Sequence, residues 1–99
     1  MKKALEATQT PHLKESFALL DRALAVIPSA SQTMSKRANQ FARGLTPAFV
    51  RRGEGCRVED VDGNTYLDYS MALSAVTLGY NYPAVTEAIK RQLASGVIF

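Results

Sequence analysis

The feature that most constrains this fold is the stretch VEDVDGNTYLDYS, from Val58 to Ser70. Two runs typical of strands, CRVEDV and TYLDYS, lie on either side of Asp62, Gly63 and Asn64. Asp-Gly between two such runs is among the strongest short signals of a hairpin, because glycine reaches a positive φ without a steric cost. The stretch therefore predicts antiparallel strands at 56–61 and 65–70, and the turn fixes which residues pair.

A further strand and two helices are predicted around this hairpin. AFVRR at 48–52 is typical of a strand, and Gly53 to Gly55 predict a turn that joins it to the next strand. Apolar residues at steps of three and four before the sheet predict a helix over 11–26, with Thr10 and Pro11 at its start and Pro28 after its end. These residues are Leu13, Phe17, Leu20, Leu24 and Ile27.

A second helix is predicted after the sheet, where Val85, Ile89 and Leu93 form one apolar stripe. Asn81 or Tyr82 would precede its first turn, and Gly96 would follow its last. The polar stretch 28–47 predicts a long loop with room for a short helical turn. Residues 1–10 are expected to be frayed, or helical without packing. The fold class is α+β: an N-terminal helix, a long loop, a three-stranded antiparallel meander and a helix.

Composition narrows the classes of function. A hydrophobic content of 46% and a charged content of 21% are those of globular material, and 99 residues allow one small domain at most. The net charge is +3, but lysines and arginines are scattered among acidic residues, which argues against a nucleic-acid binder. No apolar run has the length of a membrane span or of a secretory signal.

Cys56 is the one cysteine, so no intrachain disulfide can form and a reduced, cytoplasmic compartment fits best. We interpret it as a buried structural thiol on a strand. The chain closes on the apolar residues Val97, Ile98 and Phe99, just after a glycine. Such an end predicts a chain cut short in mid-fold, or else a small domain whose last strand packs inward.

No catalytic set of residues is complete in this sequence. His12 is interpreted as a surface histidine, since no serine or cysteine partner is implied nearby. Asp60, Asp62 and Asp68 fit turn chemistry better than a metal site. The stretch MALSAVTLGY, 71–80, is open to two interpretations: buried packing, or the wall of an apolar pocket with a few hydroxyls.

The order of these signals resembles the N-terminal region of class III pyridoxal-phosphate-dependent aminotransferases. The family's pattern has a Pro and an aromatic residue, a G-x-G turn, a D-x-D-G-N-x-Y-x-D hairpin, an L-G step, and P-x-V opening a helix. The positions that match it are Asp60, Asp62, Gly63, Asn64, Tyr66, Asp68, Leu78, Gly79, Pro83 and Val85. Upstream, QTMSKRANQFARGLTP resembles the branch of glutamate-1-semialdehyde 2,1-aminomutases.

The resemblance implies part of a fold type I enzyme that is a homodimer of much longer chains and binds pyridoxal phosphate through a lysine Schiff base. Residues 1–27 would form an N-terminal helical segment, and 28–99 the N-terminal part of the small domain. The family's catalytic lysine, its aspartate facing the pyridine nitrogen and its phosphate-binding loop lie further along the chain. No catalytic or cofactor-binding residue is therefore expected here, and the cofactor would be bound by the rest of the protein.

The resemblance also points to weak substrate-binding candidates. The aminomutase S-P-V-R loop, whose arginine helps to hold a substrate carboxylate, is matched loosely by Ser35, Lys36 and Arg37. The family segment that borders the active site corresponds to 71–77. Aminomutases have a sequence close to S-W-G-P there, whereas this chain has Ala72, Leu73, Ser74 and Ala75. Leu73 and Ser74 are the candidates in this segment, and the departure leaves the substrate open.

Three functions follow for comparison. The first is part of an aminotransferase or aminomutase that uses a small-molecule amino donor and acceptor, with the 99 residues inactive alone because the lysine is absent. The second is a free-standing dimerisation or interaction module derived from such an enzyme. The third is a small basic nucleic-acid binder. The sequence alone does not separate amino transfer from internal amino migration.

Overall fold

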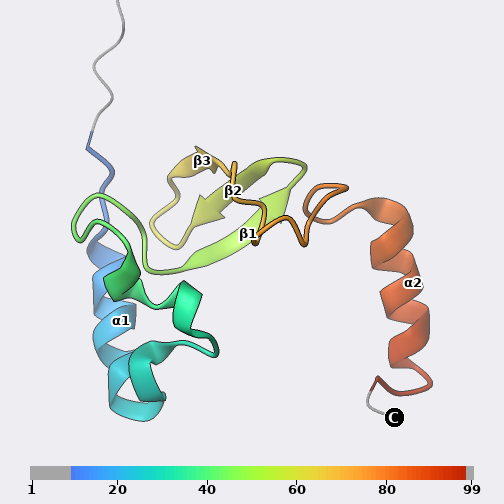
Figure 1. Ribbon diagram of the computed structural model, residues 1–99, viewed down its shortest axis with the longest axis horizontal. Coiled ribbons are helices and arrows are strands. Elements are labelled where there is room, and N and C mark those ends of the chain that lie inside the picture. The colour runs from blue at the N-terminus through green and yellow to red at the C-terminus, as the bar shows by residue number, and fades with distance from the viewer. Residues whose placement is uncertain (1–9, 98–99) are drawn as a thin grey trace, which may run out of the picture. The chain divides into compact units, whose positions relative to one another are not determined.

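The computed structural model describes residues 10–97 (Figure 1). The described residues fall into two compact units, one up to Val50 together with Asp60–Asn64, the other Arg51–Glu59 together with the residues from Thr65 onward. The element order is the predicted one: a helix, a long loop, three strands and a second helix. Within residues 10–97, no helix has the length and apolar character needed to cross a membrane. The expectation for residues 1–9, and that for Ile98 and Phe99, lies outside the described part of the chain.

Helix α1 spans Lys14–Val26, so the prediction that it begins at Pro11 was wrong by three residues. Leu13 is the N-cap and makes no side-chain capping bond. The carboxylate of Asp62, on the hairpin, instead accepts the backbone N–H groups of Glu15 and Ser16, at 2.7 and 2.8 Å. Helix α1 therefore begins where this distant acceptor satisfies its free amides. It ends before Pro28, as predicted.

The buried face of α1 contains Leu13, Ser16 and Ala23. Leu24 and Ile27, at the end of the predicted apolar stripe, are 55% and 47% exposed. Ser16 is fully buried, and its hydroxyl accepts the backbone N–H of Ala48 at 2.7 Å. This bond fastens the end of the long loop to α1.

The predicted long loop is confirmed, and it contains three short 3₁₀ turns. They are η1 (Pro28–Ala30), η2 (Met34–Lys36) and η3 (Ala38–Gln40). Backbone bonds between residues three apart close η2 and η3, from Arg37 to Met34 and from Phe41 to Ala38.

The sheet has the order β1-β2-β3, with β1 at Val50–Glu54, β2 at Arg57–Asp60 and β3 at Thr65–Leu67. The predicted turn at Gly53–Gly55 was misplaced, because Gly53 and Glu54 continue β1 and the chain turns at Gly55, whose φ is 55°. The tip of the second hairpin lies where it was predicted. Its register pairs Arg57 with Leu67 and Glu59 with Thr65.

The second hairpin closes through three residues, Val61 to Gly63. Gly63 donates to the Asp60 carbonyl and has a φ of 89°, which is the position where such a turn needs glycine. Asp62 does not share this positive φ. The returning strand was predicted to reach Ser70 but ends at Leu67, because the Asp68 carboxylate accepts the N–H groups of Ser70 and Met71 and turns the chain away.

Helix α2 spans Pro83–Leu93, with Tyr82 as N-cap and Pro83 in its first turn. The alternative N-cap, Asn81, instead accepts the hydroxyl of Thr86 at 3.0 Å. Gly96 follows the helix with a φ of 99°, as a C-terminal glycine does. Val85, Ile89 and Leu93 are 45%, 54% and 58% exposed, so their stripe lies mostly open.

Candidate functional site

A cavity of about 710 Å³ lies in the first unit, between α1 and the long loop. This volume is within the range of small-molecule sites. Much of the wall is apolar, with charged side chains among the apolar ones. Its lining residues include Phe17, Leu20, Asp21, Leu24, Arg37, Phe41, Arg43 and Pro47.

Arg37 is the candidate from the sequence that lines this cavity. Its Nε atom is buried and has no hydrogen-bond partner among the described residues. A buried donor without a partner costs free energy, and a guanidinium binds a carboxylate or phosphate with particular strength. Arg37 is therefore able to receive an anion. Ser35 and Lys36, the neighbouring candidates, are exposed and do not line the cavity.

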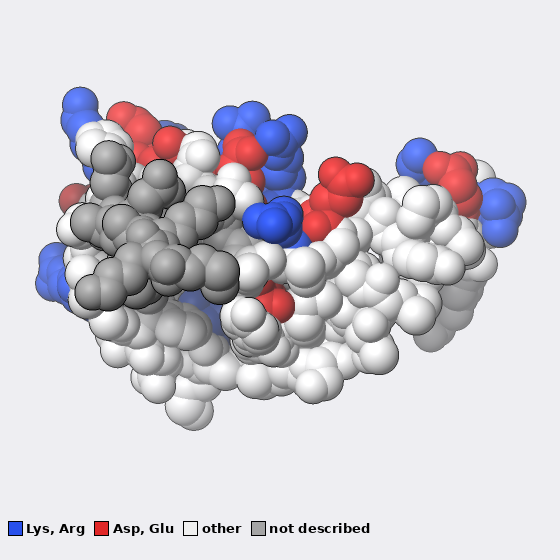
Figure 2. All heavy atoms as spheres, turned by 90° about the horizontal axis from the view of Figure 1, so that it is seen from above, with Lys and Arg blue, Asp and Glu red and all other residues white. Residues whose placement is uncertain are grey.

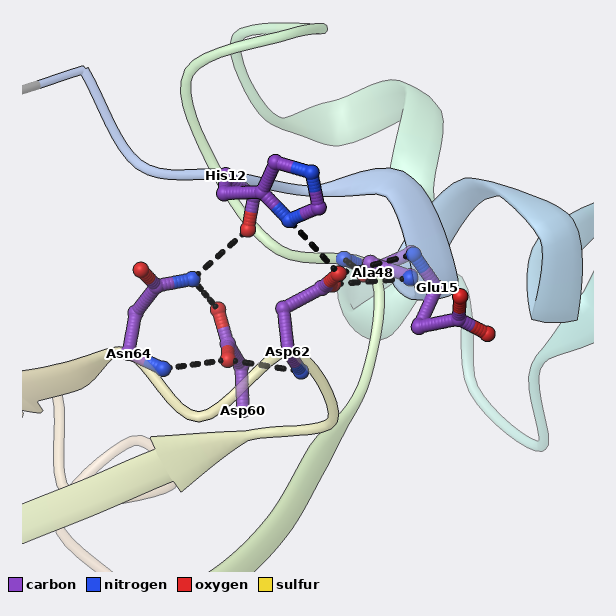
Figure 3. Close-up of polar contacts among 7 residues, drawn as sticks. His12, Glu15, Ala48, Asp60, Asp62 and Asn64 are labelled. Atoms are coloured by element: carbon purple, nitrogen blue, oxygen red, sulfur yellow. Dashed lines mark hydrogen bonds and ion pairs between the residues drawn. The ribbon is translucent and has the colours of Figure 1, made fainter.

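The conspicuous acidic residues of the hairpin tip serve structure (Figure 3). Asp60 is fully buried, and its carboxylate accepts the N–H groups of Asp62 and Asn64, at 2.9 and 2.8 Å. The Asn64 side-chain amide donates to Asp60 and to the backbone carbonyl of His12. His12 is 74% exposed, as predicted, and its Nδ1 lies 3.5 Å from Asp62. These bonds join the hairpin to the start of α1, as the turn-chemistry interpretation requires.

A second cavity, of about 600 Å³, lies in the second unit over the sheet, where Arg52, Arg57 and Glu59 line it. Glu59 forms ion pairs with Arg51 at 3.5 Å and with Arg52 at 2.6 Å. On the face that Figure 2 shows, blue and red side chains are interspersed. Glu59 thus partly neutralises Arg51 and Arg52.

The other two candidates, Leu73 and Ser74, belong to the second unit and lie in an exposed turn. Leu73 is 76% exposed. Four consecutive residues without glycine, Met71 to Ser74, have positive φ values between 46° and 68°. The interpretation of this segment as buried packing was wrong, and neither of the two cavities contains Leu73 or Ser74 in its lining.

Asp68 and Tyr80 form a hydrogen-bonded pair in which the protonation of both groups is clearly perturbed. The Tyr80 hydroxyl donates to Asp68 Oδ2 at 2.6 Å. This hydrogen bond is the main reason that the pKa of Tyr80 rises to about 12, with desolvation adding to it. The same bond lowers the pKa of Asp68 below its usual 3.8; partial desolvation opposes the effect, and the N–H groups of Met71 and Ser70 add to it. The sequence contained no signal that these two side chains meet.

Cys56 was predicted as a buried thiol on a strand, and this was wrong. Its side chain is exposed, and the residue lies in the turn between β1 and β2. Among residues 10–97, no three histidine, cysteine or acidic side chains are grouped so that they could hold a metal ion.

The sequence profile of the family described as "Aminotransferase class-III" matches residues 39–99. The chain belongs to the class III aminotransferases. It is 44% identical to glutamate-1-semialdehyde 2,1-aminomutase of Chloroherpeton thalassium over 89 residues. These residues make up 89% of this chain and 20% of that protein. This class III chain thus spans about a fifth of the length of that relative.

Solved structures agree with the family. A structure described as a transaminase with PLP bound superposes with a TM-score of 0.74 at 29% identity, over 90% of this chain and 20% of that one. A glutamate-1-semialdehyde aminomutase from Pseudomonas aeruginosa PAO1 superposes with a TM-score of 0.70 at 26% identity, over 88% and 18%. The class III chain therefore has the fold of the corresponding part of these fold type I enzymes.

The family implies pyridoxal phosphate, but the described residues do not fit this cofactor. It is held as a Schiff base with a lysine amine in a protected pocket. The lysines within residues 10–97 are Lys14, Lys36 and Lys90; all three are exposed, and none lines either cavity. This part of a class III enzyme thus offers no Schiff-base site.

Proposed function

We propose that this chain supplies part of the substrate site of a class III aminotransferase or aminomutase. In that enzyme, pyridoxal phosphate held elsewhere in the protein would carry the amino group between a small-molecule donor and an acceptor. The family match over residues 39–99 supports the reaction class. The observation that carries the role of this segment is the buried Nε of Arg37, which has no partner in the described chain and belongs to a residue lining a ligand-sized cavity.

Arg37 would hold a carboxylate of the substrate. A carboxylate would accept from this guanidinium, whose Nε has no partner among the described residues, while Phe17, Leu20 and Phe41 give an apolar wall for the carbon chain. Lys36 is a weaker anchor, because its side chain is exposed and its attraction for an anion is screened by water. Leu73 and Ser74, in the second unit, are proposed separately as substrate contacts, on the resemblance alone.

The 99 residues alone would be inactive, because no described lysine is placed to bind the cofactor. The complete enzyme would be a homodimer in the cytoplasm. The aminomutase relatives point to an amino acid semialdehyde as one substrate class. The residues Ala72 to Ala75, which depart from the aminomutase pattern, leave transfer between two molecules as the alternative reaction.

A graft tests the proposal. The part of the Chloroherpeton thalassium aminomutase that matches this chain is replaced by this chain, and cofactor loading, kcat and KM are measured with carboxylate substrates. We expect a loaded, active enzyme in which Arg37→Gln raises KM about tenfold or more. Lys90→Gln, far along the sequence in α2 and paired with Glu87, is the matched control and should leave KM unchanged.

The proposal is wrong if the graft loads pyridoxal phosphate but has no amino-transfer activity with any carboxylate tested. A graft in which Arg37→Gln and Lys90→Gln behave alike would remove Arg37 from the substrate site while leaving the reaction class in place.

One observation favours a second candidate, the free-standing interaction module. The stripe of Val85, Ile89 and Leu93 on α2 is about half exposed, and such a stripe normally packs against a partner surface. This candidate predicts that the 99 residues unfold cooperatively and associate with a partner in solution. The interaction module would be excluded if light scattering shows that the isolated chain is a monomer and the chain unfolds gradually in urea.

A further inference from the structure

The turn from Met71 to Ser74 has a conformation that its residues do not favour. All four carry a β-carbon, and all four have positive φ values. The left-handed conformation costs an L-residue about 1–2 kcal/mol, and it persists where the surrounding structure fixes it. Two bonds within the turn, from Ser74 N to Ser70 O and from Val76 N to Met71 O, are both 3.1 Å long. They do not explain why the chain enters this conformation.

The Asp68 carboxylate binds both ends of the segment 71–80, which contains this turn. Its Oδ1 accepts the N–H groups of Ser70 and Met71, at 2.8 and 3.0 Å, where the chain enters the turn. Its Oδ2 accepts the hydroxyl of Tyr80 at 2.6 Å, where the chain leaves the segment. One side chain thus connects the two ends, and bonds to a charged acceptor are the stronger kind.

Tyr80 is itself fixed from two directions. Its backbone forms a pair of hydrogen bonds with Gly55, at 3.0 and 2.8 Å. Its ring lies against Gly53, where an added β-carbon would be only 2.7 Å from Cγ of the ring. Gly53 therefore leaves the room in which the Tyr80 ring can reach Asp68.

The turn that these bonds fix is displayed to solvent. Leu73 is 76% exposed and Ser74 is exposed, whereas Asp68 and Tyr80 are half-buried. A costly conformation that presents an apolar side chain and a hydroxyl, instead of burying them, is typical of a ligand-binding segment.

We propose that Asp68 and Tyr80 are positioning residues, whose hydrogen bond holds the left-handed turn Met71–Ser74 so that Leu73 and Ser74 contact the carbon chain of the amino substrate. This role rests on the proposed function for its ligand, and on the geometry of the second unit for its mechanism. Removing the Tyr80 hydroxyl leaves the ring in place but frees one end of the segment.

Hydrogen exchange in the 99-residue chain tests the mechanism. The amides of Ser74 and Val76 report on the turn, and the amide of Thr86, bonded to Tyr82 at 2.9 Å in α2, reports on the rest of the unit. We expect Tyr80→Phe to speed exchange at Ser74 and Val76 about tenfold, and to leave Thr86 unchanged. Tyr69→Phe is the matched control, because Tyr69 is 92% exposed.

Unchanged exchange at Ser74 and Val76 in Tyr80→Phe would overturn the proposal. Should Tyr80→Phe also speed exchange at Thr86, Asp68→Asn provides the second variant, since it keeps one acceptor oxygen. Faster exchange confined to the turn in that variant supports the proposal, and no change there overturns it.

Kinetics of the grafted aminomutase test the link to substrate. The parent graft, which keeps Tyr80, must first be shown to be active. Relative to that parent, Tyr80→Phe should raise KM several-fold while cofactor loading stays the same. If the graft is active and Tyr80→Phe leaves its KM unchanged, the positioning role alone is overturned. A loaded but inactive parent graft overturns the proposed function, and the substrate role with it, whatever the exchange rates show.

Discussion

At the scale of single residues, this chain uses buried polar side chains to fix its backbone, within one turn or between segments distant in sequence. Ser16 accepts the N–H of Ala48, and Asp60 gathers the amides of its own hairpin. Both are fully buried. Because a buried polar group costs free energy unless it is paired, these bonds specify one arrangement of the first unit more sharply than its small apolar core does.

Ser16→Ala tests this use of a buried hydroxyl. The change leaves the Ala48 N–H without its acceptor in a part-buried site, so the free energy of unfolding should fall by about 1–3 kcal/mol. Urea denaturation followed by circular dichroism measures it. Ser95→Ala changes an exposed serine that bonds to Gln92 through its backbone, so it should change stability by less than about 0.5 kcal/mol. Equal losses in the two variants would contradict the account.

The Asp68–Tyr80 pair predicts a loss of stability in strong acid and also in strong base. The folded pKa of Asp68 is lowered, so its contribution to stability is present above the usual value of 3.8 and is lost as the pH falls through the folded value. Tyr80 has a folded pKa raised to about 12, so its contribution is complete below its usual 10.0 and is lost as the pH rises toward 12.

Carbon-13 NMR of the Tyr80 phenol checks this prediction. The wild-type ring should ionise near pH 12, and Asp68→Asn should bring its pKa back toward 10.0. A Tyr80 that ionises at 10.0 in the wild-type chain would show that the hydrogen bond to Asp68 does not persist in solution.

At the scale of elements, helix α1 depends on an acceptor that is not its own. Its first free amides bond to Asp62, which lies 47 and 46 residues further along the chain from Glu15 and Ser16. The carboxylate also lies at the positive end of the helix dipole. The hairpin and the helix therefore stabilise each other.

Asp62→Ala should remove this cap and lower the free energy of unfolding by about 1 kcal/mol, with faster amide exchange at Glu15 and Ser16. Asp62→Asn, which keeps an acceptor oxygen, should lose less. Unchanged exchange at both amides in Asp62→Ala would mean that the start of α1 is held by other contacts.

The turn glycines differ in a way that a matched pair of substitutions can separate. Gly79 and Gly63 both have φ near 90°, so alanine is strained at either position. A β-carbon at Gly79 would lie 3.0 Å from Cα of Gly55, whereas at Gly63 it would meet nothing within 4 Å. Gly79→Ala should therefore destabilise the chain by more than Gly63→Ala in thermal unfolding. The reverse order would contradict the close approach of Gly55 and Gly79.

The elements were predictable from sequence to the extent that their signals are local. Short stretches of sequence predict the Asp-Gly hairpin, the periodic helices and the end of the first helix before Pro28. The structure has all three. The start of α1 and the end of β3 were misjudged, because Asp62 and Asp68 bond to amides that propensity does not show. The left-handed turn that begins at Met71 contains no glycine, so the sequence does not predict its positive φ values.

At the scale of the whole molecule, family membership came from the order of motifs, which the match over residues 39–99 confirms. The substrate candidates were named by resemblance alone, and no finding tests them. Geometry distinguishes among them: Arg37 lines a cavity, while Ser35, Lys36, Leu73 and Ser74 are exposed. The pairing of Asp68 with Tyr80 could not be predicted, since it depends on a tertiary approach between the sheet and the segment that follows it.

The central claim is that these residues serve a pyridoxal-phosphate enzyme without binding its cofactor themselves. The most direct test is the absorption spectrum of the 99-residue chain after incubation with pyridoxal phosphate and removal of the free cofactor. The account predicts no internal-aldimine band, and no cofactor-labelled lysine after borohydride reduction and mass spectrometry. A stable band that disappears when one lysine is changed to arginine would contradict it, and would place a complete cofactor site within these residues.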